Sequence, residues 1–273
     1  MLRWAKLSCP SHDNRLENAH SLIMPLSSLP NQLFELLAEP FTAERLFDGL
    51  HDTVYFIKNA EGQYVVVNET LVQRCGLKQK SQLIGRTSEQ ILRAPFGANF
   101  TAQDKAVLQS GKALEAQLEL HLYASRDEGW CLTNKYPLRG RDGNSVGVVG
   151  ISRDLGRPNK SSDDYQSVAK AVAYAERNRD KPTSVTDMAE VANLSRFQLD
   201  RRMRIAFGLN TGQWLVKQRI DFACEHLETT DMPIVDIAHE AGYADQSAFT
   251  RQFRRATGMS PSHFRKAKQD NEL

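Results

Sequence analysis

Two short segments near the C-terminus combine arginine with amide and hydroxyl side chains, which are residue types that read the edges of DNA bases. The polar side chains of the first segment are Arg196, Gln198, Arg201, Arg202 and Arg204. Those of the second segment are Gln246, Ser247, Thr250, Arg251 and Arg254. Arginine can donate two hydrogen bonds to a guanine edge, and glutamine can pair with adenine. For any single arginine, a solvated face is the alternative.

The two segments belong to an internal repeat. Pairs at a spacing of 50 positions are Leu199 with Phe249, Arg201 with Arg251, Met203 with Phe253, Gly208 with Gly258, and Trp214 with Phe264. Upstream, Met188-Ala189 matches Ile237-Ala238 at a spacing of 49 positions. Duplication explains these matches more simply than chance. Because both copies carry such an arginine segment, DNA contact is favoured over a solvated face.

Each copy of the repeat predicts a helix-turn-helix. Ser184 and Ser195 are placed to cap the two helices of the first copy, and Asp245 the second helix of the second copy. Apolar residues at helical spacing predict the buried side of each second helix. These residues are Leu199, Met203, Phe207, Phe249 and Phe253. One long helix that includes Trp214 to Leu227 is predicted to connect the copies.

The region before the repeat predicts a small α+β domain. Short β-rich segments are separated by turn residues. The predicted strands cover 53–57, 64–67, 114–123, 130–136 and 146–151. Two short amphipathic helices, around Leu33 to Leu37 and Leu46 to Leu50, are expected to precede them. We therefore expect a five-stranded antiparallel sheet with helices on one face, followed by an all-α region with two helix-turn-helix units.

These patterns divide the chain into four zones. We predict a loose tail over 1–32, an α+β domain with its leading helices over 33–155, a linker over 156–163, and a DNA-binding domain over 164–268. The proposed linker is rich in Pro, Asn, Lys, Ser and Asp, a composition that is typical of loops.

Three residues of one predicted central strand, Trp130, Thr133 and Lys135, are candidates for ligand binding. A buried lysine needs a counter-charge, because burial of an unpaired charge is costly. A small polar metabolite with a carboxylate would supply one. A surface lysine and an internal ion pair are the alternatives. His121 could be a haem ligand, but its place in an alternating strand favours a solvent-facing side chain.

The first domain resembles a PAS domain over about a hundred residues. The resemblance depends on segments that occur in the expected order, Tyr55 to Asn59, Gly62 to Asn68, Pro137 to Arg139, Asp142-Gly143 and Val148 to Leu155. It implies a sensor that binds a small molecule, carries haem or flavin, or dimerises. Arg74-Cys75-Gly76 does not match the Asn-Cys-Arg motif of flavin photoreceptors, so photosensing is rejected and no cofactor is predicted.

The C-terminal region, 164–267, is similar to the AraC family of transcription regulators. The matching residues include Asp187-Met188-Ala189, Leu194-Ser195, Ala241-Gly242-Tyr243, Phe253-Arg254-Arg255 and Ser260-Pro261. The resemblance implies two helix-turn-helix units that enter successive major grooves, one helical turn of about 34 Å apart. It also implies base contacts from Phe197, Arg201, Gln246, Ser247, Thr250 and Arg251. There are two departures: Asn210-Thr211 replaces a Ser-Pro pair, and Asp200, beside the arginines, is placed to repel phosphate or choose a base.

Composition limits the other function classes. The chain has 273 residues and a net charge of only +2, so affinity for nucleic acid must come from locally placed arginine and lysine. Its four cysteines form no close pair of the kind that zinc or redox motifs need. No apolar run is long enough to span a bilayer, and a cytoplasmic protein without membrane contact is expected. Neither a nucleophile–base pair nor a phosphate-binding glycine loop indicates an enzyme.

The predicted function is sequence-specific transcription regulation, as an activator, under the control of a small molecule at the PAS domain. The expected partners are double-stranded promoter DNA, RNA polymerase and a small-molecule effector, with a homodimer through the PAS domain as a further option. The alternative is a PAS domain that serves only dimerisation, with constitutive DNA binding. A protein-interaction adaptor is the third interpretation.

Overall fold

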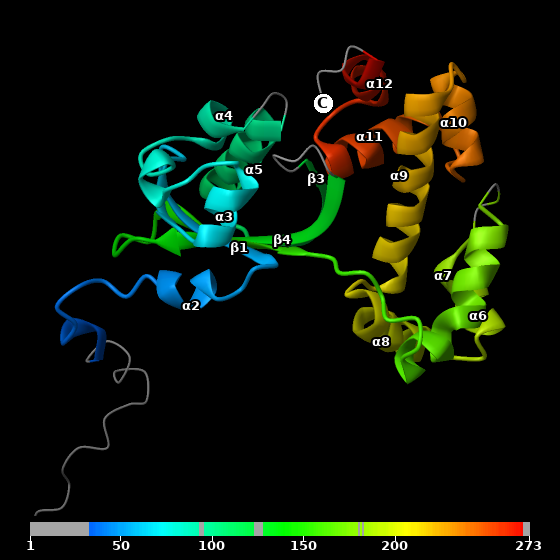
Figure 1. Ribbon diagram of the computed structural model, residues 1–273, viewed down its shortest axis with the longest axis horizontal. Helices are drawn as coiled ribbons and strands as arrows, with labels where there is room; N and C mark the ends of the chain where they lie inside the picture. The colour runs from blue at the N-terminus through cyan, green and yellow to red at the C-terminus, as the bar shows by residue number, and fades with distance from the viewer. Residues whose placement is uncertain (1–32, 93–95, 123–127, 180, 182, 270–273) are drawn as a thin grey trace, which may run out of the picture. The chain divides into compact units, whose positions relative to one another are not determined.

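The computed structural model describes residues 33–92, 96–122, 128–179, 181 and 183–269 (Figure 1). Contacts group the chain into two units, 1–42 and 43–273. In the described part of the smaller unit, residues 33–35 form one helical turn, and the rings of Phe34 and Phe41 stack with their centroids 6.4 Å apart. All elements described below belong to the larger unit.

The first half of the larger unit is built on an antiparallel sheet. Its strands are β1 (Thr53–Asn59), β2 (Tyr64–Val67), β3 (Leu114–Leu122), β4 (Glu128–Arg139) and β5 (Ser145–Asp154). Their order across the sheet is β2-β1-β5-β4-β3, and every neighbouring pair is antiparallel. The predicted five-stranded sheet is confirmed, and β4 extends beyond its predicted ends.

Short helices accompany this sheet, and Figure 1 shows α3, α4 and α5 on the same face of it. The helical elements here are α2 (Glu44–Asp48), α3 (Glu69–Arg74), the 3₁₀ helix η2 (Lys80–Gln82), α4 (Ser88–Ile91) and α5 (Phe96–Ser110). The amide oxygen of buried Asn68 accepts hydrogen bonds from the backbone N–H groups of Tyr55 and Leu71. Asn68 therefore caps α3 and joins it to β1.

The second half is helical. Its elements are α6 (Asp163–Arg177), α7 (Val185–Val191), α8 (Arg196–Phe207), α9 (Thr211–Thr229), α10 (Ile234–Glu240), α11 (Gln246–Thr257) and α12 (Pro261–Gln269). The pairs α7–α8 and α10–α11 are the two predicted helix-turn-helix units. The predicted inner residues Leu199, Met203, Phe249 and Phe253 are fully buried. Phe207 is partly buried and packs on Trp214.

Both repeat copies use the same backbone devices at their turns and ends. Asn193 and Gly242, equivalent turn residues, have positive φ angles of 52° and 78°, a conformation that asparagine and glycine adopt most easily. Gly208 and Gly258 end α8 and α11 in the left-handed conformation, with φ angles of 72° and 77°. Glycine avoids the steric cost of this helix ending.

Side-chain caps begin the helices where the sequence predicts them. Ser184 and Ser195 form capping boxes with Asp187 and Gln198. Asp245 accepts a hydrogen bond of 2.7 Å from the backbone N–H of Ala248. Asn210 caps α9 in place of the serine that it replaces.

We predict that Asp245→Ala lowers the free energy of unfolding by about 1 kcal/mol, because a backbone N–H in the first turn of α11 loses its acceptor. Urea denaturation of the full chain measures this change. Asp231→Ala is the matched control, because Asp231 is exposed in the connection between α9 and α10. An equal loss in both variants would contradict the capping role.

Candidate functional site

The candidate DNA-contacting residues lie on the outer sides of α8 and α11. Arg196, Phe197, Gln198 and Arg201 are exposed and Arg202 is half-buried. On α11, Gln246, Ser247, Arg251 and Arg254 are exposed and Thr250 is half-buried. The opposite side of each helix is in the core. Both arginine faces are therefore accessible within the described chain.

Two residues of α8 have structural tasks as well. The amide oxygen of Gln198 accepts a hydrogen bond from the backbone N–H of Ser195, at 2.9 Å. The carboxylate of Asp200 accepts hydrogen bonds from both the backbone N–H and the hydroxyl of Thr211. Asp200 therefore joins the middle of α8 to the start of α9, and the expectation that it repels phosphate or selects a base stays a prediction. The partner of Asp200, Thr211, is one of the two residues that stand in place of the expected Ser-Pro pair.

A cavity of about 330 Å³ lies between the sheet and the helices of the first half. Alternate residues of a strand share one face, and Val54, Phe56 and Lys58 of β1 face the cavity in this way. Phe96 and Phe100 of α5, one helical turn apart, line it from the other side. Other residues of its wall include Tyr64, Leu71, Ser88, Ile91, Thr133 and Ser152.

One end of the cavity holds a buried cluster of three charged groups. Lys58 and Lys135 both donate hydrogen bonds to the carboxylate of Asp104, and the distance from Lys135 Nζ to Asp104 Oδ1 is 2.6 Å. All three side chains are at most 3% exposed. Lys58 also donates a 2.7 Å hydrogen bond to Ser88 Oγ, and its ammonium lies 4.3 Å from the centroid of the Tyr64 ring.

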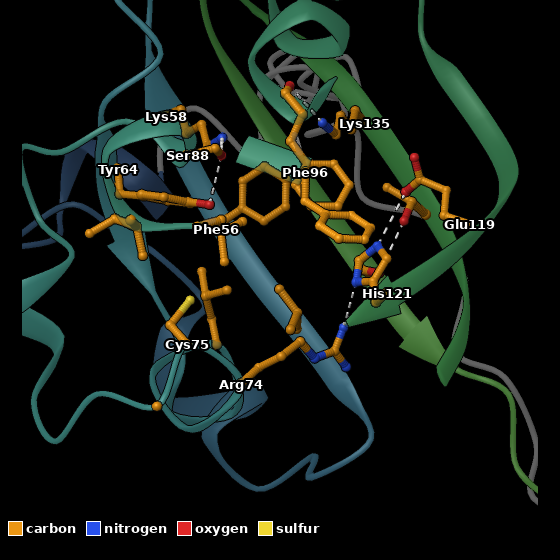
Figure 2. A pocket seen from close by; sticks show the side chains of 18 residues that line it. Phe56, Lys58, Tyr64, Arg74, Cys75, Ser88, Phe96, Glu119, His121 and Lys135 are labelled. Atoms are coloured by element: carbon orange, nitrogen blue, oxygen red, sulfur yellow. Dashed lines mark hydrogen bonds and ion pairs between the residues drawn. The ribbon is translucent and has the colours of Figure 1, made fainter. Parts of the chain in front are cut away.

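The other end of the cavity holds a second polar group. Figure 2 shows Lys58, Ser88 and Tyr64 at the upper left of the view, Glu119 and His121 at the right, and Arg74 below His121, joined to it by a dashed line. His121 Nε2 lies 3.5 Å from Glu119 Oε2, and its Nδ1 lies 3.3 Å from an Arg74 nitrogen. Arg74 also pairs with Asp154 at 2.5 Å.

Burial and neighbouring charges move the pKa values around the cavity. Burial lowers the pKa of Lys58, although Asp104 acts against this. Burial also raises the pKa of the Cys75 thiol to about 11. For His121, burial by itself would lower the pKa, but Cys131 and Glu119 outweigh it and raise the pKa to about 9. Burial would raise the pKa of Glu119, but His121 and Lys135 lower it.

The three predicted ligand residues do not share one face of the sheet. Thr133 and Lys135 line the cavity. Trp130 lies at an odd spacing from both and is absent from the cavity wall as described; its indole N–H donates a 2.7 Å hydrogen bond to Asp221 of α9. Lys135 forms an internal ion pair with Asp104, which was one of the two alternatives to ligand binding. The expectation of a solvent-facing His121 is wrong, because its side chain is 11% exposed and faces the cavity.

The sequence analysis missed Lys58 and Asp104, the partners of Lys135 at the cavity end. A signal for Lys58 existed, because it continues the alternation of Val54 and Phe56 along β1. Asp104 follows Phe96 and Phe100 at intervals of four residues, which is the period of a helix face. In the described residues, no group of three potential ligands could hold a metal ion, and no helix has the length and apolarity needed to cross a membrane.

Comparisons with known proteins match both halves of the chain. Residues 188–267 match a family described as a helix-turn-helix domain, and residues 47–159 match one described as a PAS fold. The regulatory protein SoxS of Escherichia coli K12 is 32% identical over 94 residues, which are 34% of this chain and 88% of SoxS. A putative AraC-like transcription regulator of Streptomyces antibioticus is 31% identical over 99 residues, 36% of this chain and 33% of that protein.

Solved structures with a similar C-terminal region exist as well. The DNA-binding domain of AdpA, crystallised in complex with a target DNA, is 33% identical. The match covers 38% of this chain and 95% of the AdpA domain, with a TM-score of 0.37.

We predict that Glu119→Gln lowers the pKa of His121 from about 9, because the imidazolium loses its neighbouring carboxylate. NMR titration of the histidine ring measures this shift. In the native protein, the stabilisation from this raised pKa is complete below about pH 6.5, the ordinary histidine pKa, and is lost as the pH rises through about 9. In Glu119→Gln, this stabilisation is lost at a lower pH, because the pKa of His121 is lower. An unchanged His121 pKa would contradict the pairing.

Proposed function

Because the chain belongs to the AraC family of transcription regulators and carries a PAS domain, we propose that it binds promoter DNA through α8 and α11 under the control of a small molecule in the PAS cavity. The observation that supports DNA binding most strongly is the equivalent placement of Arg201 and Arg251. Each is exposed on the second helix of a capped helix-turn-helix, at the same position of the repeat.

The helix α9 gives the two units a spacing that suits one face of DNA. Its 19 residues correspond to a length of about 28 Å at 1.5 Å per residue, close to the roughly 34 Å between successive major grooves. Figure 1 shows α8 near one end of α9 and α11 near the other. We propose base contacts by Arg201, Gln246, Ser247, Thr250 and Arg251.

Phe197 is proposed to contact a base through its apolar ring. It is 75% exposed at the start of α8, and an aromatic side chain in the major groove can pack on a thymine methyl group. The remaining candidates, Arg196, Gln198, Arg202 and Arg254, are proposed to contact DNA from the same faces. Their charges and amides suit phosphate as well as bases.

Control by the PAS cavity is supported by the two faces of β4. Thr133 and Lys135 line the cavity, and Trp130 on the other face bonds to Asp221 of α9. On β3, Gln117, which pairs with Thr133 across the sheet, accepts a 2.8 Å hydrogen bond from Arg255 of α11. A ligand that shifts these strands would therefore move residues in contact with the DNA-binding helices. We propose that the contact restrains α11 until ligand binds.

The chain is proposed to consist of three regions. We infer a sensor region that ends near residue 155, a linker over 156–163 and a DNA-binding region over 164–268. The regulator acts on the chromosome in the cytoplasm, without a catalytic step, and activates transcription by contact with RNA polymerase. The competing proposal is that the PAS domain serves only dimerisation and that the protein binds DNA constitutively.

We expect Arg201→Ala and Arg251→Ala each to weaken specific DNA binding by about 1–3 kcal/mol. Bound genomic fragments recovered with the full chain supply the DNA, and fluorescence anisotropy measures the affinity at several salt concentrations. Arg141→Ala, at an exposed position of the turn between β4 and β5, is the control. If both recognition-helix variants keep the native affinity, the assigned base contacts are refuted.

We expect Gln117→Met to raise the DNA affinity of the ligand-free chain by about 5–150-fold, because α11 loses two hydrogen bonds that each contribute about 0.5–1.5 kcal/mol. The same anisotropy assay measures this gain. Gln109→Met, at an exposed site of α5, controls for the substitution itself. Unchanged affinity would favour the domain that only dimerises.

A further inference from the structure

The charges at one end of the PAS cavity are unequal. Two ammonium groups, Lys58 and Lys135, share the single carboxylate of Asp104. The carboxylate of Glu119 is also near enough to Lys135 to lower its own pKa, but Gln103 and His121 engage it directly, and the raised pKa of His121 supplies the charge that balances it. Because an excess charge inside a protein is costly unless it is paired, the lysine end of the cavity is suited to one further negative charge.

The remainder of the cavity is suited to an apolar ring. Phe56, Phe96 and Phe100 line it together with Leu71 and Ile91. The Phe100 ring contacts both polar ends, with its centroid 5.7 Å from Lys135 Nζ and 4.9 Å from the centroid of the His121 ring. The volume of about 330 Å³ is at the lower end of the roughly 300–1,000 Å³ that ligand pockets span.

We propose that the cavity binds a small monocarboxylate with a ring-sized apolar body, with its carboxylate beside Lys58 and Lys135 and its ring among the phenylalanines. This inference rests on the proposed function, because it names the class of signal that the PAS domain receives. The ligand carboxylate joins that of Asp104, so that two anions face two cations. The ring packs against aromatic side chains, which favour offset or edge-to-face contacts.

The number of charges selects a carboxylate over a phosphate ester. A phosphate monoester carries a charge of about −1.5 to −2 near neutral pH, which exceeds the one unpaired cation at this end of the cavity. A neutral amide of the same shape offers no charge at all. The three kinds of ligand are therefore distinguishable by affinity.

A bound anion also stabilises the charged form of Lys58. Burial lowers the pKa of Lys58, and a bound carboxylate raises it again by favouring the ammonium form. Around Lys58 lie Asp104, Lys135, Tyr64 and Cys75. Burial raises the pKa values of the last two above their ordinary range, so neither adds a negative charge near pH 7 and Asp104 supplies the anion beside the two lysines.

Isothermal titration of the full chain with phenylacetate tests the proposal, with phenylacetamide as the neutral twin and phenyl phosphate as the dianion. We expect phenylacetate to bind at least about tenfold more tightly than either. Equal or tighter binding of the amide or the phosphate ester, or no binding of phenylacetate at millimolar concentration, would overturn the assignment.

Three variants locate the site. Lys58→Met leaves Lys135 and Asp104 as a balanced pair and is expected to weaken phenylacetate binding at least about tenfold. Lys105→Met is the control, since Lys105 is exposed on α5 next to Asp104 in sequence. Asp104→Asn removes the competing carboxylate and is expected to strengthen binding, an effect that general destabilisation would not produce. An equal loss in Lys58→Met and Lys105→Met would place the binding elsewhere. If Asp104→Asn fails to fold, the two lysine variants decide.

Failure of this inference is distinguishable from failure of the proposed function. If phenylacetate does not bind but Arg201→Ala still weakens DNA binding, only the class of ligand is wrong. If phenylacetate binds in the cavity but leaves DNA affinity unchanged, the ligand class stands and control by the PAS domain fails.

Discussion

The contact of Asp104 with Lys58 and Lys135 is the constraint on which the first half of the molecule depends. All three groups are almost completely buried, so each needs the others. Because the two lysines come from β1 and β4 and the carboxylate comes from α5, the cluster joins this helix to two strands. Phe96 and Phe100, on the same side of α5, then close the cavity above the sheet. The interaction that fixes the helix thus also determines the charge of this end of the cavity.

The second half depends on a different constraint, the length and the ends of α9. Asn210 caps its start, and Thr211 in the first turn holds Asp200 of α8. Trp214 and Leu227 are buried near its two ends, where the flanking units pack. A straight helix keeps its length because its backbone hydrogen bonds lie within the segment. Two recognition helices anchored to it can match a repeating partner such as duplex DNA.

The strand β4 connects these halves because alternate residues face opposite sides. Lys135 faces the cavity, and Trp130 faces α9, where its ring also lies 5.6 Å from the ammonium of Lys217. A displacement of this strand would move side chains in both packed layers, without any intervening loop.

The sequence by itself determined the features that local rules control. Ser195 and Asp245 begin helices because their side chains reach backbone N–H groups three residues ahead. The repeat placed Arg201 and Arg251 at equivalent exposed positions. Only the tertiary structure decided the cavity. Lys58 and Asp104 are 46 residues apart, and period-two alternation says which strand residues share a face but not which face the helices cover. For this reason Trp130 was grouped with Thr133 and Lys135 as a ligand candidate, and His121 was expected to face solvent.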